Sequence, residues 1–465
     1  MRVIVAIASY GTNNDHFLAQ LLAEYRAMPY DVHVVVLSNV AKNLDPAVEV
    51  VVGLPDEKNP FSLPFAHRKL FGERRDDYDL YIYSEDDTLL RHKNVEAFLK
   101  ATDALPVDEL AGFLRSEIDA EGNVYYSTVH NHYHWDPSSV RQVGEFTFAH
   151  FTNEHAACSV LTREQLKKAI ASGGFLVPPH EGRYGLLEAA ATDPYTRCGF
   201  RKMIAVSHLD EFTLPHLPNK YIGKLGLPKQ VFELQLEVLR NMAGKRCSAP
   251  PFGKETNVPG GRWSKSYYEP VFRDFISLVP ADARHALAIG CGWGAMESVL
   301  VSRGVRVSGI PLDCIIAPCA AARGVKILTG CDPMNFASLP SEEFDTILLS
   351  HILHLVPDPP EYLASVSRLL RAGGKIVVRV PNVGGLPLWR NKWSSNGEYN
   401  DLADFRKSGV QQTSARTLRK WLRLARFQVT EFLPVARGRV AKAGRLTMGL
   451  ANSFLAEEFL AVGEK

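Results

Sequence analysis

Apolar runs and amphipathic segments alternate along the first part of the chain in the order expected for a parallel α/β sheet. An apolar run at residues 3–8 is followed by a polar turn, an amphipathic segment at residues 16–28 and a second apolar run at residues 31–38. Short apolar runs predict buried strands, and the amphipathic segment predicts a helix that covers them. A third run, YDLYIYS, ends at an acidic triplet, residues 85–87. Because ligands bind at the carboxyl ends of parallel strands, this triplet is a candidate site.

The same alternation returns in the second part, where a glycine-rich turn separates a strand from a helix. A helix predicted over YYEPVFRDFISLV, from residue 267, comes first. Strand HALAIG, turn CGWG and helix AMESVLVSRG are then followed by the runs VRVSGI, KILTG, FDTILLS and KIVVRV. Between the two parts, residues 246–262 contain three prolines and three glycines and have no hydrophobic period, which is typical of a linker. The pattern predicts an α/β fold with two doubly wound domains, residues 1–245 and 266–465, joined by a linker at residues 246–265.

Composition narrows the class of protein without identifying it. The 465 residues are 46% hydrophobic and carry a net charge of +2, so both domains can bury a core and no strongly basic surface for nucleic acid is expected. Seven scattered cysteines without a CxxC pair indicate reduced thiols, and we expect a cytoplasmic protein. No run approaches the ~20 apolar residues of a membrane span, and the short apolar N-terminus is not typical of a signal peptide. Peripheral contact with a membrane is compatible with the sequence.

Carboxylates directly after an apolar strand suit the chemistry of nucleotide sugars. A divalent cation held by carboxylate oxygens neutralises the pyrophosphate leaving group as the glycosidic bond breaks. The triplet resembles the E-D-D form of the DxD motif of GT-A glycosyltransferases, a form found in N-acetylglucosaminyltransferase I. The resemblance implies that Asp87 binds Mn²⁺ or Mg²⁺, that Glu85 and Asp86 lie near the ribose and a metal-bound water, and that the donor is a UDP- or GDP-sugar. Ser9 and Tyr10, in the polar turn after the first strand, would contact the nucleotide base. The alternative is a solvated acidic turn.

Residues further along the chain would complete such a glycosyltransferase site. GT-A enzymes often complete the metal shell with a downstream histidine, which the resemblance places at His216, with His208 as the alternative. An inverting transferase also needs a carboxylate base for the acceptor hydroxyl. Glu188 is our first choice for this base, and Glu181 and Asp193 are the other candidates in the same segment. A retaining mechanism stays open, and each of the three acids has a surface or helix-capping role as its alternative.

The segment NVYYSTVHNHYHWDPSS combines aromatic and histidine side chains and permits two interpretations. His130, His132 and His134 would share one face of a strand, where histidines can bind a metal. We prefer a loop in which Tyr133 and Trp135 stack on a sugar or a base, and ordinary core packing of these rings is the alternative.

The glycine-rich turn of the second part, ALAIGCGWGAMESVL, resembles motif I of class I S-adenosylmethionine-dependent methyltransferases. Gly290, Gly292 and Gly294 would let the backbone approach the methionine part of the cofactor. The segments FDTILLSHILHLVPDPPEYLASVSRLLRAGGKIVVRVPN and SARTLRKWLRLARFQV also resemble the family, and the likeness covers most of residues 266–465. The resemblance implies a Rossmann-like methyltransferase domain.

Three acids that this family uses to bind the cofactor are replaced. Ala288, Pro311 and Cys331 stand where Asp or Glu is expected, and Asp313 and Asp332 follow two residues and one residue later. Loss of a carboxylate–ribose contact costs about 1.5–3 kcal/mol of binding free energy. Either the domain has lost or altered its binding of S-adenosylmethionine, which we favour, or a local bulge brings Asp313 and Asp332 into these roles.

Two further features of the second part are candidates for function. His351 and His354 follow the fourth strand, where some members of the family carry a catalytic base. The basic segment ARGRVAKAGR could meet an anionic glycan, a phosphate or a membrane surface, although most such runs are simply solvated.

Together these patterns predict a metal-dependent glycosyltransferase with a fused methyltransferase-like domain. It would move a sugar from a nucleotide-sugar donor to a glycan, a lipid-linked acceptor or a metabolite. Two alternatives are a bifunctional glycosyltransferase and sugar O-methyltransferase, and a methyltransferase whose N-terminal domain only binds the acceptor. The sugar, the acceptor and the oligomeric state do not follow from the sequence.

Overall fold

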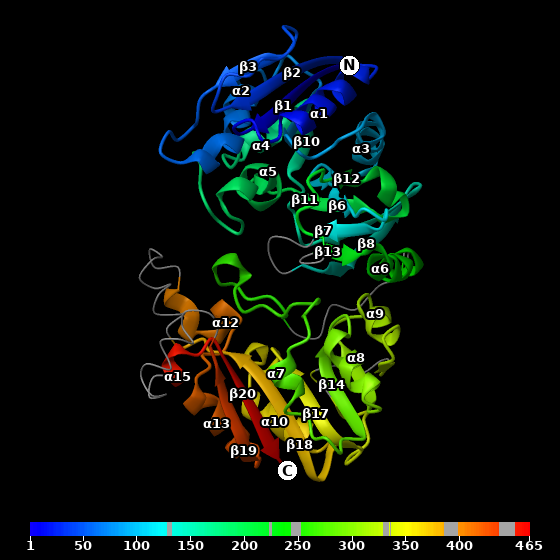
Figure 1. The fold of residues 1–465 in the computed structure, drawn as a ribbon, viewed down its shortest axis with the longest axis vertical. Helices are drawn as coiled ribbons and strands as arrows, with labels where there is room; N and C mark the ends of the chain where they lie inside the picture. Colours follow the sequence, from blue (N-terminus) through cyan, green and yellow to red (C-terminus); the bar gives the residue numbers. More distant parts are fainter. Residues whose placement is uncertain are drawn as a thin grey trace. The chain divides into compact units, whose positions relative to one another are not determined.

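The computed structural model describes residues 1–127, 133–222, 226–242, 253–328, 334, 336–385, 399–436 and 452–465. The chain divides into two compact units, Met1–Cys247 and Ser248–Lys465 (Figure 1). Each unit has its own sheets and its own buried core, so each is described by itself.

A five-stranded mixed sheet in the order β10-β4-β1-β2-β3 forms the centre of the first unit. Strands β1, β2, β3 and β4 are parallel neighbours, and β10 pairs antiparallel with β4. The apolar runs of β1, β2 and β4 are largely buried, as expected for central parallel strands, whereas the edge strand β3 exposes Val51 and Val52. The carboxyl ends of β1 and β4 bring Ser9 and Glu85 to the same edge of the sheet. The strands are β1 (Arg2–Ser9), β2 (Asp31–Ser38), β3 (Glu49–Val52), β4 (Leu80–Glu85) and β10 (Cys158–Thr162).

The first unit differs from the predicted single doubly wound sheet because its described part contains two further sheets. One has the strand order β5-β11-β9-β8 and the other the order β12-β6-β7-β13. These strands are β5 (Glu109–Ala111), β6 (Leu114–Ile118), β7 (Val124–Ser127), β8 (Trp135–Val143), β9 (Phe146–Phe151), β11 (Arg201–Ala205), β12 (Thr213–Pro215) and β13 (Gly226–Pro228). The helices of this unit are α1 (Asp15–Ala27), α2 (Ala66–Glu73), α3 (His92–Ala104), α4 (Arg163–Ala171), α5 (Leu186–Thr196) and α6 (Lys229–Met242).

The aromatic segment of the first unit packs in the core. Tyr133 and Trp135 are buried, and both rings contact Phe151. The ring of Trp135 also packs against Phe232 of α6. The preferred interpretation, an aromatic loop for a sugar or a base, is therefore wrong for these two rings, because their faces are covered by other core side chains. His130 and His132 lie outside the described residues.

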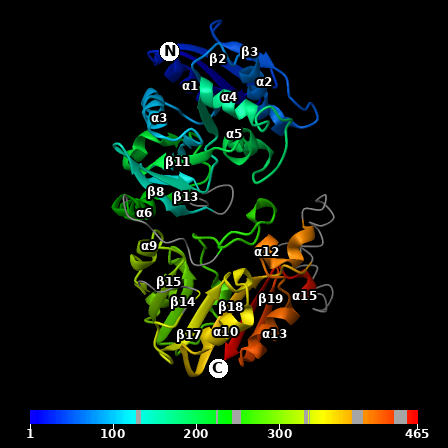
Figure 2. The same ribbon diagram turned by 180° about the vertical axis from the view of Figure 1, so that it is seen from behind.

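The second unit is built on one seven-stranded sheet in the order β16-β15-β14-β17-β18-β20-β19. Strands β14 to β18 are parallel, and β20 runs antiparallel between β18 and β19, so the sheet is Rossmann-like. Figures 1 and 2, from opposite sides, show α7 and α8 over one face and α10 and α13 over the other. The strands are β14 (His285–Cys291), β15 (Arg306–Pro311), β16 (Lys326–Ile327), β17 (Phe344–Ser350), β18 (Leu370–Pro381), β19 (Gln428–Val435) and β20 (Glu458–Glu464). The helices include α7 (Arg273–Ile276), α8 (Ala295–Ser302), α9 (Ala317–Ala321), α10 (Pro359–Ser367), α12 (Phe405–Ser408), α13 (Ala415–Leu424) and α15 (Asn452–Leu455).

The stretch before β14 differs from the sequence prediction in two ways. The helix predicted from residue 267 onward is confined to α7, Arg273–Ile276. The described part of the predicted linker, residues 253–265, packs within the second unit, and Lys254 and Lys265 are 4% and 3% exposed. Composition indicated a solvated connector, but these lysines find buried acidic partners.

In the part of the chain that the structure describes, no helix combines the length and the apolar character needed to cross a membrane.

Candidate functional sites

The glycine-rich turn of the second unit lies at the carboxyl end of β14 and opens α8. Gly290 and Gly294 have φ angles of 69° and 84°, a left-handed conformation that favours glycine. A Cβ atom at Gly294 would lie 2.7 Å from the Cα of Ala320, and one at Gly292 would lie 2.1 Å from the carbonyl oxygen of Tyr267. Glycine is therefore required at these positions, and the close approach at Gly292 is made by the chain itself.

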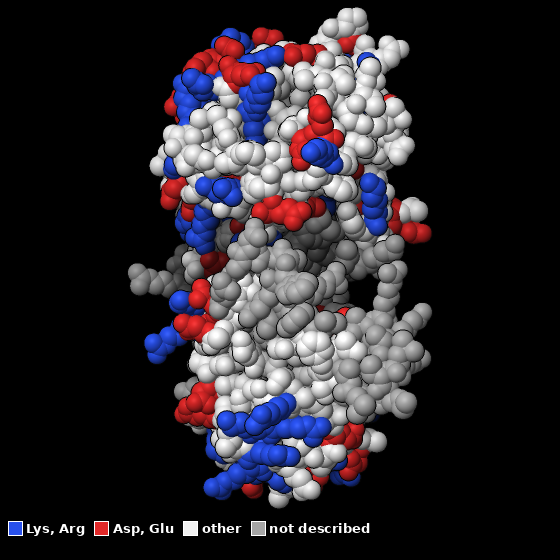
Figure 3. Space-filling view, turned by 90° about the vertical axis from the view of Figure 1, so that its left-hand side faces the viewer, with Lys and Arg blue, Asp and Glu red and all other residues white. Residues whose placement is uncertain are grey.

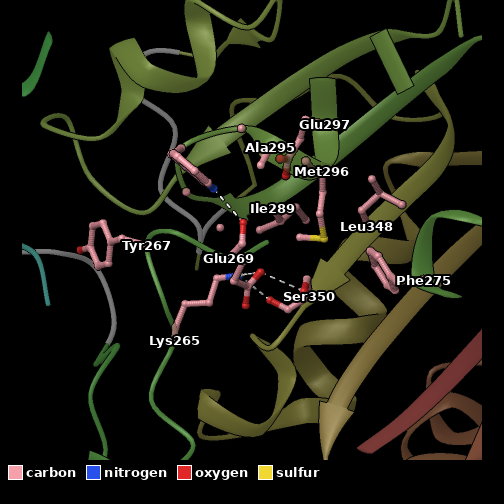
Figure 4. Close-up of a pocket in the computed structure, with 15 residues that line it drawn as sticks. Lys265, Tyr267, Glu269, Phe275, Ile289, Ala295, Met296, Glu297, Leu348 and Ser350 are labelled. Carbon is pink, nitrogen blue, oxygen red and sulfur yellow. Dashed lines mark hydrogen bonds and ion pairs between the residues drawn. The ribbon is translucent and has the colours of Figure 1, made fainter. Parts of the chain in front are cut away.

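A segment at the start of the second unit lies directly on this turn, and we call residues 254–269 the closing segment (Figure 4). The amide of Trp293 donates to the carbonyl oxygen of Tyr267 at 2.9 Å, and the indole N–H of Trp293 donates to the carbonyl oxygen of Glu269 at 2.7 Å. The hydroxyl of Tyr267 donates to Asp313 at 2.7 Å, and Nζ of Lys254 lies 3.2 Å from the same carboxylate. The segment thus spans from the glycine turn to the end of β15.

Asp313 has no accepting position left for a further ligand in this conformation. Its Oδ1 accepts from the amides of Ile315 and Ile316 at 2.9 Å each, and its Oδ2 takes the contacts from Tyr267 and Lys254. A carboxylate offers about four lone-pair sites, and all four are used. Asp313 therefore lies just after β15 and holds the closing segment there, and its role toward the cofactor stays a prediction.

Buried charges fix the other end of the closing segment. Nζ of Lys265 lies 2.6 Å from Oε2 of Glu269 and donates to the carbonyl oxygen of Ser350 at 2.8 Å. His351 lies between Oε1 of Glu269, at 2.9 Å, and Oε1 of Glu458, at 3.2 Å. Burial alone would raise the pKa of Glu269, but Lys265 and His351 outweigh it and lower the pKa to about 2. A pair of buried carboxylates needs such cations close by.

The two histidines after β17 are not placed as bases. Burial lowers the pKa of His351, but Glu269 and Glu458 outweigh this and raise it overall, so the imidazolium form is favoured. With both ring nitrogens facing carboxylates, His351 balances charge and has no free lone pair for a proton. Burial lowers the pKa of His354 to about 3, and its Nε2 bonds the carbonyl oxygen of Trp263.

The space between the turn and the closing segment is too small for a nucleoside. It measures about 10 Å³, the least that one water molecule needs, and is lined by residues such as Lys265, Gly290 and Ser350. Pro311 ends β15 opposite Cys291, and Ala288 is buried in β14, so neither supplies the missing acid. Cys331 and Asp332 lie outside the described residues. Asp313 and the glycine turn lie near each other, but the space beside the turn is filled by the chain.

In the first unit, the acidic triplet meets the turn after β1. Oδ2 of Asp86 accepts from the hydroxyl of Ser9, and Oδ1 accepts from the side-chain amide of Asn14, each at 2.7 Å. Lys42 is almost fully buried, and its Nζ donates to Ser9 at 3.0 Å. Tyr10 is 54% exposed at the same edge. Ser9 and Asp86 therefore form one hydrogen-bonded group, as expected for a shared site.

Asp87 faces the histidine that the resemblance selected. Nε2 of His216 lies 3.5 Å from Oδ2 of Asp87, while Nδ1 of His216 lies 2.5 Å from Oε1 of Glu117. Nζ of Lys220 lies 3.8 Å from the same oxygen of Asp87. Burial would raise the pKa of Asp87, but His216 and Lys220 outweigh it and lower the pKa below its ordinary value. Oδ1 of Asp87 is buried and has no hydrogen-bond partner among the described residues.

The metal prediction has partial geometric support. A buried carboxylate oxygen without a partner is the type of atom that a divalent cation uses. In the conformation described, however, no group of three or more His, Cys, Asp or Glu side chains among the described residues could hold a metal ion. His208 does not share the site of His216, since its ring contacts Phe146 and its Nδ1 lies 2.8 Å from the hydroxyl of Ser207.

Of the three candidate bases, the structure brings one to the triplet. Burial and then the charge of Asp87 raise the pKa of Glu85 to about 8, and the charge of Glu188, in the first turn of α5, also contributes. Glu181 is exposed in the loop before α5. Asp193 is buried in an ion pair with Arg68, whose guanidinium lies 2.6 Å from Oδ2, so this carboxylate stabilises the core and is not free to act as a base.

Sequence reasoning missed several residues that shape the two sites. Lys42 and Asn14 follow the first two strands, and polar residues at strand ends are a weak signal for such a role. No sequence pattern indicated the roles of Glu117, Tyr267 and Lys265, because the contacts of these side chains depend on the folded structure.

Comparisons with known proteins concern the second unit. Residues 266–431 match the family model described as "Methyltransferase domain". A ubiquinone biosynthesis O-methyltransferase from Pseudomonas aeruginosa is 29% identical over 107 residues, which are 21% of this chain and 45% of that protein. The enzyme of the same name from Coxiella burnetii is 26% identical over 97 residues, 20% of this chain and 42% of that protein. The chain thus spans less than half the length of these curated relatives.

Two solved structures are also similar to part of this chain. A SAM dependent methyltransferase from Archaeoglobus fulgidus is 16% identical, with 42% of this chain and 90% of that one covered and a TM-score of 0.32. A 1,6-didemethyltoxoflavin-N1-methyltransferase from Burkholderia thailandensis is 20% identical, with 42% and 77% covered and a TM-score of 0.30. By its family match, the second unit contains a methyltransferase domain. The glycosyltransferase interpretation of the first unit stays a prediction.

Proposed function

We propose that this protein is an S-adenosylmethionine-dependent methyltransferase that methylates a hydroxyl group on its acceptor. The observation that carries this proposal is the glycine turn at the carboxyl end of β14, with Asp313 at the end of the neighbouring strand β15, inside a matched methyltransferase domain. The O-methyltransferase names of the curated relatives support the choice of an oxygen acceptor. Of the functions derived from the sequence, this one has the broader support.

The chain's own groups suit the parts of the cofactor. Amides of the glycine turn, such as that of Trp293, would hold the methionine carboxylate, and Asp313 would accept from the ribose hydroxyls. The carbonyl oxygen of Ser350 would accept from the amino group. When bound, the cofactor supplies an electrophilic methyl group. All three groups are engaged by the closing segment in the conformation described, so binding requires those contacts to break.

Titration calorimetry with S-adenosylhomocysteine tests this proposal. We expect saturable binding to the full chain. In chains that also carry Tyr267→Phe, so that this hydroxyl no longer ties the closing segment to residue 313, Asp313→Asn should weaken binding at least about tenfold, because a charge-assisted contact is worth roughly 1.5–3 kcal/mol. Glu361→Gln, on the exposed side of α10, is the matched control and should bind like the parent. No binding at millimolar ligand by either the parent or the chains with a loosened closing segment would contradict the proposal. Methyl transfer from labelled S-adenosylmethionine to hydroxylated acceptors then defines the acceptor.

A second candidate function belongs to the first unit, where one observation favours it. Asp86 shares hydrogen bonds with the turn after β1, and Asp87 faces His216 with a free buried oxygen. This arrangement supports binding of a nucleotide diphosphate sugar through a divalent cation, with Glu188 as the base in an inverting transfer. The protein would then be a glycosyltransferase as well as a methyltransferase. If the first unit binds only the acceptor, nucleotide and metal will have no effect on it.

Basic side chains on α13 support an anionic or lipid-linked acceptor. Figure 3 shows Lys and Arg side chains gathered on the surface of the second unit. Arg416, Lys420 and Arg423 of α13 are exposed, and no ion pair joins them to an acid within the described ranges. Leu424 is 59% exposed beside them. Cations next to an exposed apolar residue are typical of helices that rest on anionic membranes.

A further inference from the structure

Every group that the proposed function assigns to S-adenosylmethionine already has a partner in the closing segment, residues 254–269. The amide of Trp293 donates to the carbonyl oxygen of Tyr267. Asp313 accepts a hydrogen bond from the hydroxyl of Tyr267 and pairs with the ammonium of Lys254. The carbonyl oxygen of Ser350 is taken by the ammonium of Lys265. One continuous stretch of chain therefore satisfies all three.

The partners also match in chemical type. A carbonyl oxygen stands in for a carboxylate oxygen at the glycine turn, and a phenolic hydroxyl stands in for a ribose hydroxyl at Asp313. An ammonium group stands in for the amino group of the cofactor at Ser350. We propose that the closing segment is an internal occupant of the cofactor cleft, which competes with adenosyl ligands and must leave before one can bind. This inference rests on the proposed function.

A lid that closes over a bound cofactor would leave space beneath it, and this segment leaves almost none. The carbonyl oxygen of Tyr267 lies where a single Cβ atom on Gly292 would approach it to 2.1 Å, so no ligand atom fits between them. The remaining cavity is about 10 Å³. Segment and ligand are therefore mutually exclusive at the glycine turn.

The closing segment is held firmly enough to control affinity. Lys265 is buried and donates to the carbonyl oxygen of Ser350 at 2.8 Å, Glu269 lies 2.9 Å from His351, and Lys254 is buried beside Asp313. When the binding-competent state is only a fraction of the population, the apparent Kd rises by the inverse of that fraction. Loosening the segment should thus tighten ligand binding without any new contact to the ligand.

The first test compares variants of the full chain by titration calorimetry with S-adenosylhomocysteine. Tyr267→Phe removes the hydroxyl from Asp313, and Tyr267→Phe combined with Lys265→Met also removes the contact at Ser350. We expect stepwise tighter binding, at least about tenfold for the pair. Tyr30→Phe, which removes a hydroxyl near His92 in the first unit, is the matched control and should bind like the parent. Circular dichroism verifies that each variant is folded.

The second test uses the unaltered protein, so it does not depend on how the variants fold. Trypsin can cut after Lys254, Arg262 and Lys265, and the rate at these sites reports whether the segment is packed. We expect saturating S-adenosylhomocysteine to accelerate cleavage there by severalfold, because the displaced segment is exposed. Sites in the first unit should cleave at the same rate with and without ligand.

Three outcomes separate the two proposals. Tighter binding by the variants and faster cleavage with ligand support the internal occupant. Weaker binding by the variants, or protection of the segment by ligand, shows that the segment is part of the ligand site and overturns this inference while keeping the proposed function. Absence of binding by the parent and by both variants at millimolar ligand overturns the proposed function, and this inference with it.

Discussion

His216 and Asp87 face each other in the first unit, with Nε2 of the histidine 3.5 Å from Oδ2 of the carboxylate. A backbone bridge between Thr88 and His216 fixes this approach, since it ties the segment after β4 to the end of β12. Glu117 holds the other ring nitrogen at 2.5 Å. The histidine is thus oriented by one carboxylate toward another, an arrangement common around metal sites.

This pair makes the role of a divalent cation testable. If Asp87 binds the cation, Mn²⁺ should strengthen the binding of UDP or GDP to the full chain by at least about tenfold, because the cation bridges two sets of anionic oxygens. Asp87→Ala should abolish the gain, measured by calorimetry. Asp45→Ala, an exposed acid in an ion pair with Arg26, is the matched control. Equal nucleotide binding with and without Mn²⁺ in the parent would exclude the metal-dependent interpretation.

The buried carboxyl group of Glu85 should make the stability of the first unit depend on pH. Burial and the neighbouring charge of Asp87 raise its pKa from 4.5 to about 8 in the folded state. Between these two values the folded chain binds one proton more than the unfolded chain, so stability falls as the pH rises from about 4.5 to about 8. Calorimetry without divalent cations should show this loss, on the order of a few kcal/mol.

Glu85→Gln should remove this dependence of folding stability on pH. Relative to the parent, it should stabilise the first unit more at pH 8 than at pH 5. Glu181→Gln, an exposed acid in the same unit, should leave the slope unchanged. A slope that survives in Glu85→Gln would assign the effect to another group. A cation bound at Asp87 would lower the pKa of Glu85 by its charge, and Mn²⁺ should then flatten the curve of the parent.

Much of the fold could be predicted because strands and helices leave periodic traces in a sequence. The runs before Ser9 and Glu85 predicted strands of one parallel sheet, and their adjacency in the structure brings Asp86 to Ser9. The glycines of the CGWG turn predicted a tight strand-to-helix connection, which Gly290 and Gly294 provide with left-handed backbones. Local rules were sufficient there, because the required conformation depends on neighbouring residues.

The closing segment could not be predicted, because its structure depends on partners far along the chain. Prolines and glycines at residues 246–262 are typical of a linker, and the sequence does not show that Lys254 is buried beside Asp313. Likewise, the helix predicted from residue 267 fails because Tyr267 bonds the glycine turn instead of continuing a helical ladder. The extra sheets of the first unit were missed because their strands are short.

The exposed cations of α13 predict binding to anionic vesicles. Arg416→Gln, Lys420→Gln and Arg423→Gln together should weaken sedimentation with phosphatidylserine-containing vesicles by at least about tenfold, since each cation near such a surface contributes about 1 kcal/mol. Added salt should weaken the binding of the parent protein to these vesicles in the same way. Three exposed lysines of the first unit, Lys69, Lys93 and Lys100, changed to Gln together, form the matched control. Equal loss in both triple variants would indicate nonspecific attraction and contradict a role for α13.

The buried charges below the glycine turn predict an acid-sensitive second unit. Lys265 and His351 lower the pKa of Glu269 from 4.5 to about 2 against the effect of burial. A lowered folded pKa contributes stability that is complete above the unfolded value of 4.5 and is lost as the pH falls toward 2. The contribution at pH 7 is roughly 3 kcal/mol, from about 1.36 kcal/mol for each pH unit.

Glu269→Gln should therefore lower the melting temperature of the second unit at pH 7, and its difference from the parent should shrink steadily below pH 4.5. Lys265→Met should also destabilise the unit at pH 7, by about 3–5 kcal/mol, because it removes one partner of a buried pair. Restoring neutrality in the double variant Lys265→Met and Glu269→Gln should recover part of this loss, and calorimetry measures the coupling between the two changes. If the two single losses are additive and do not depend on pH, the ion pair does not hold the closing segment in place.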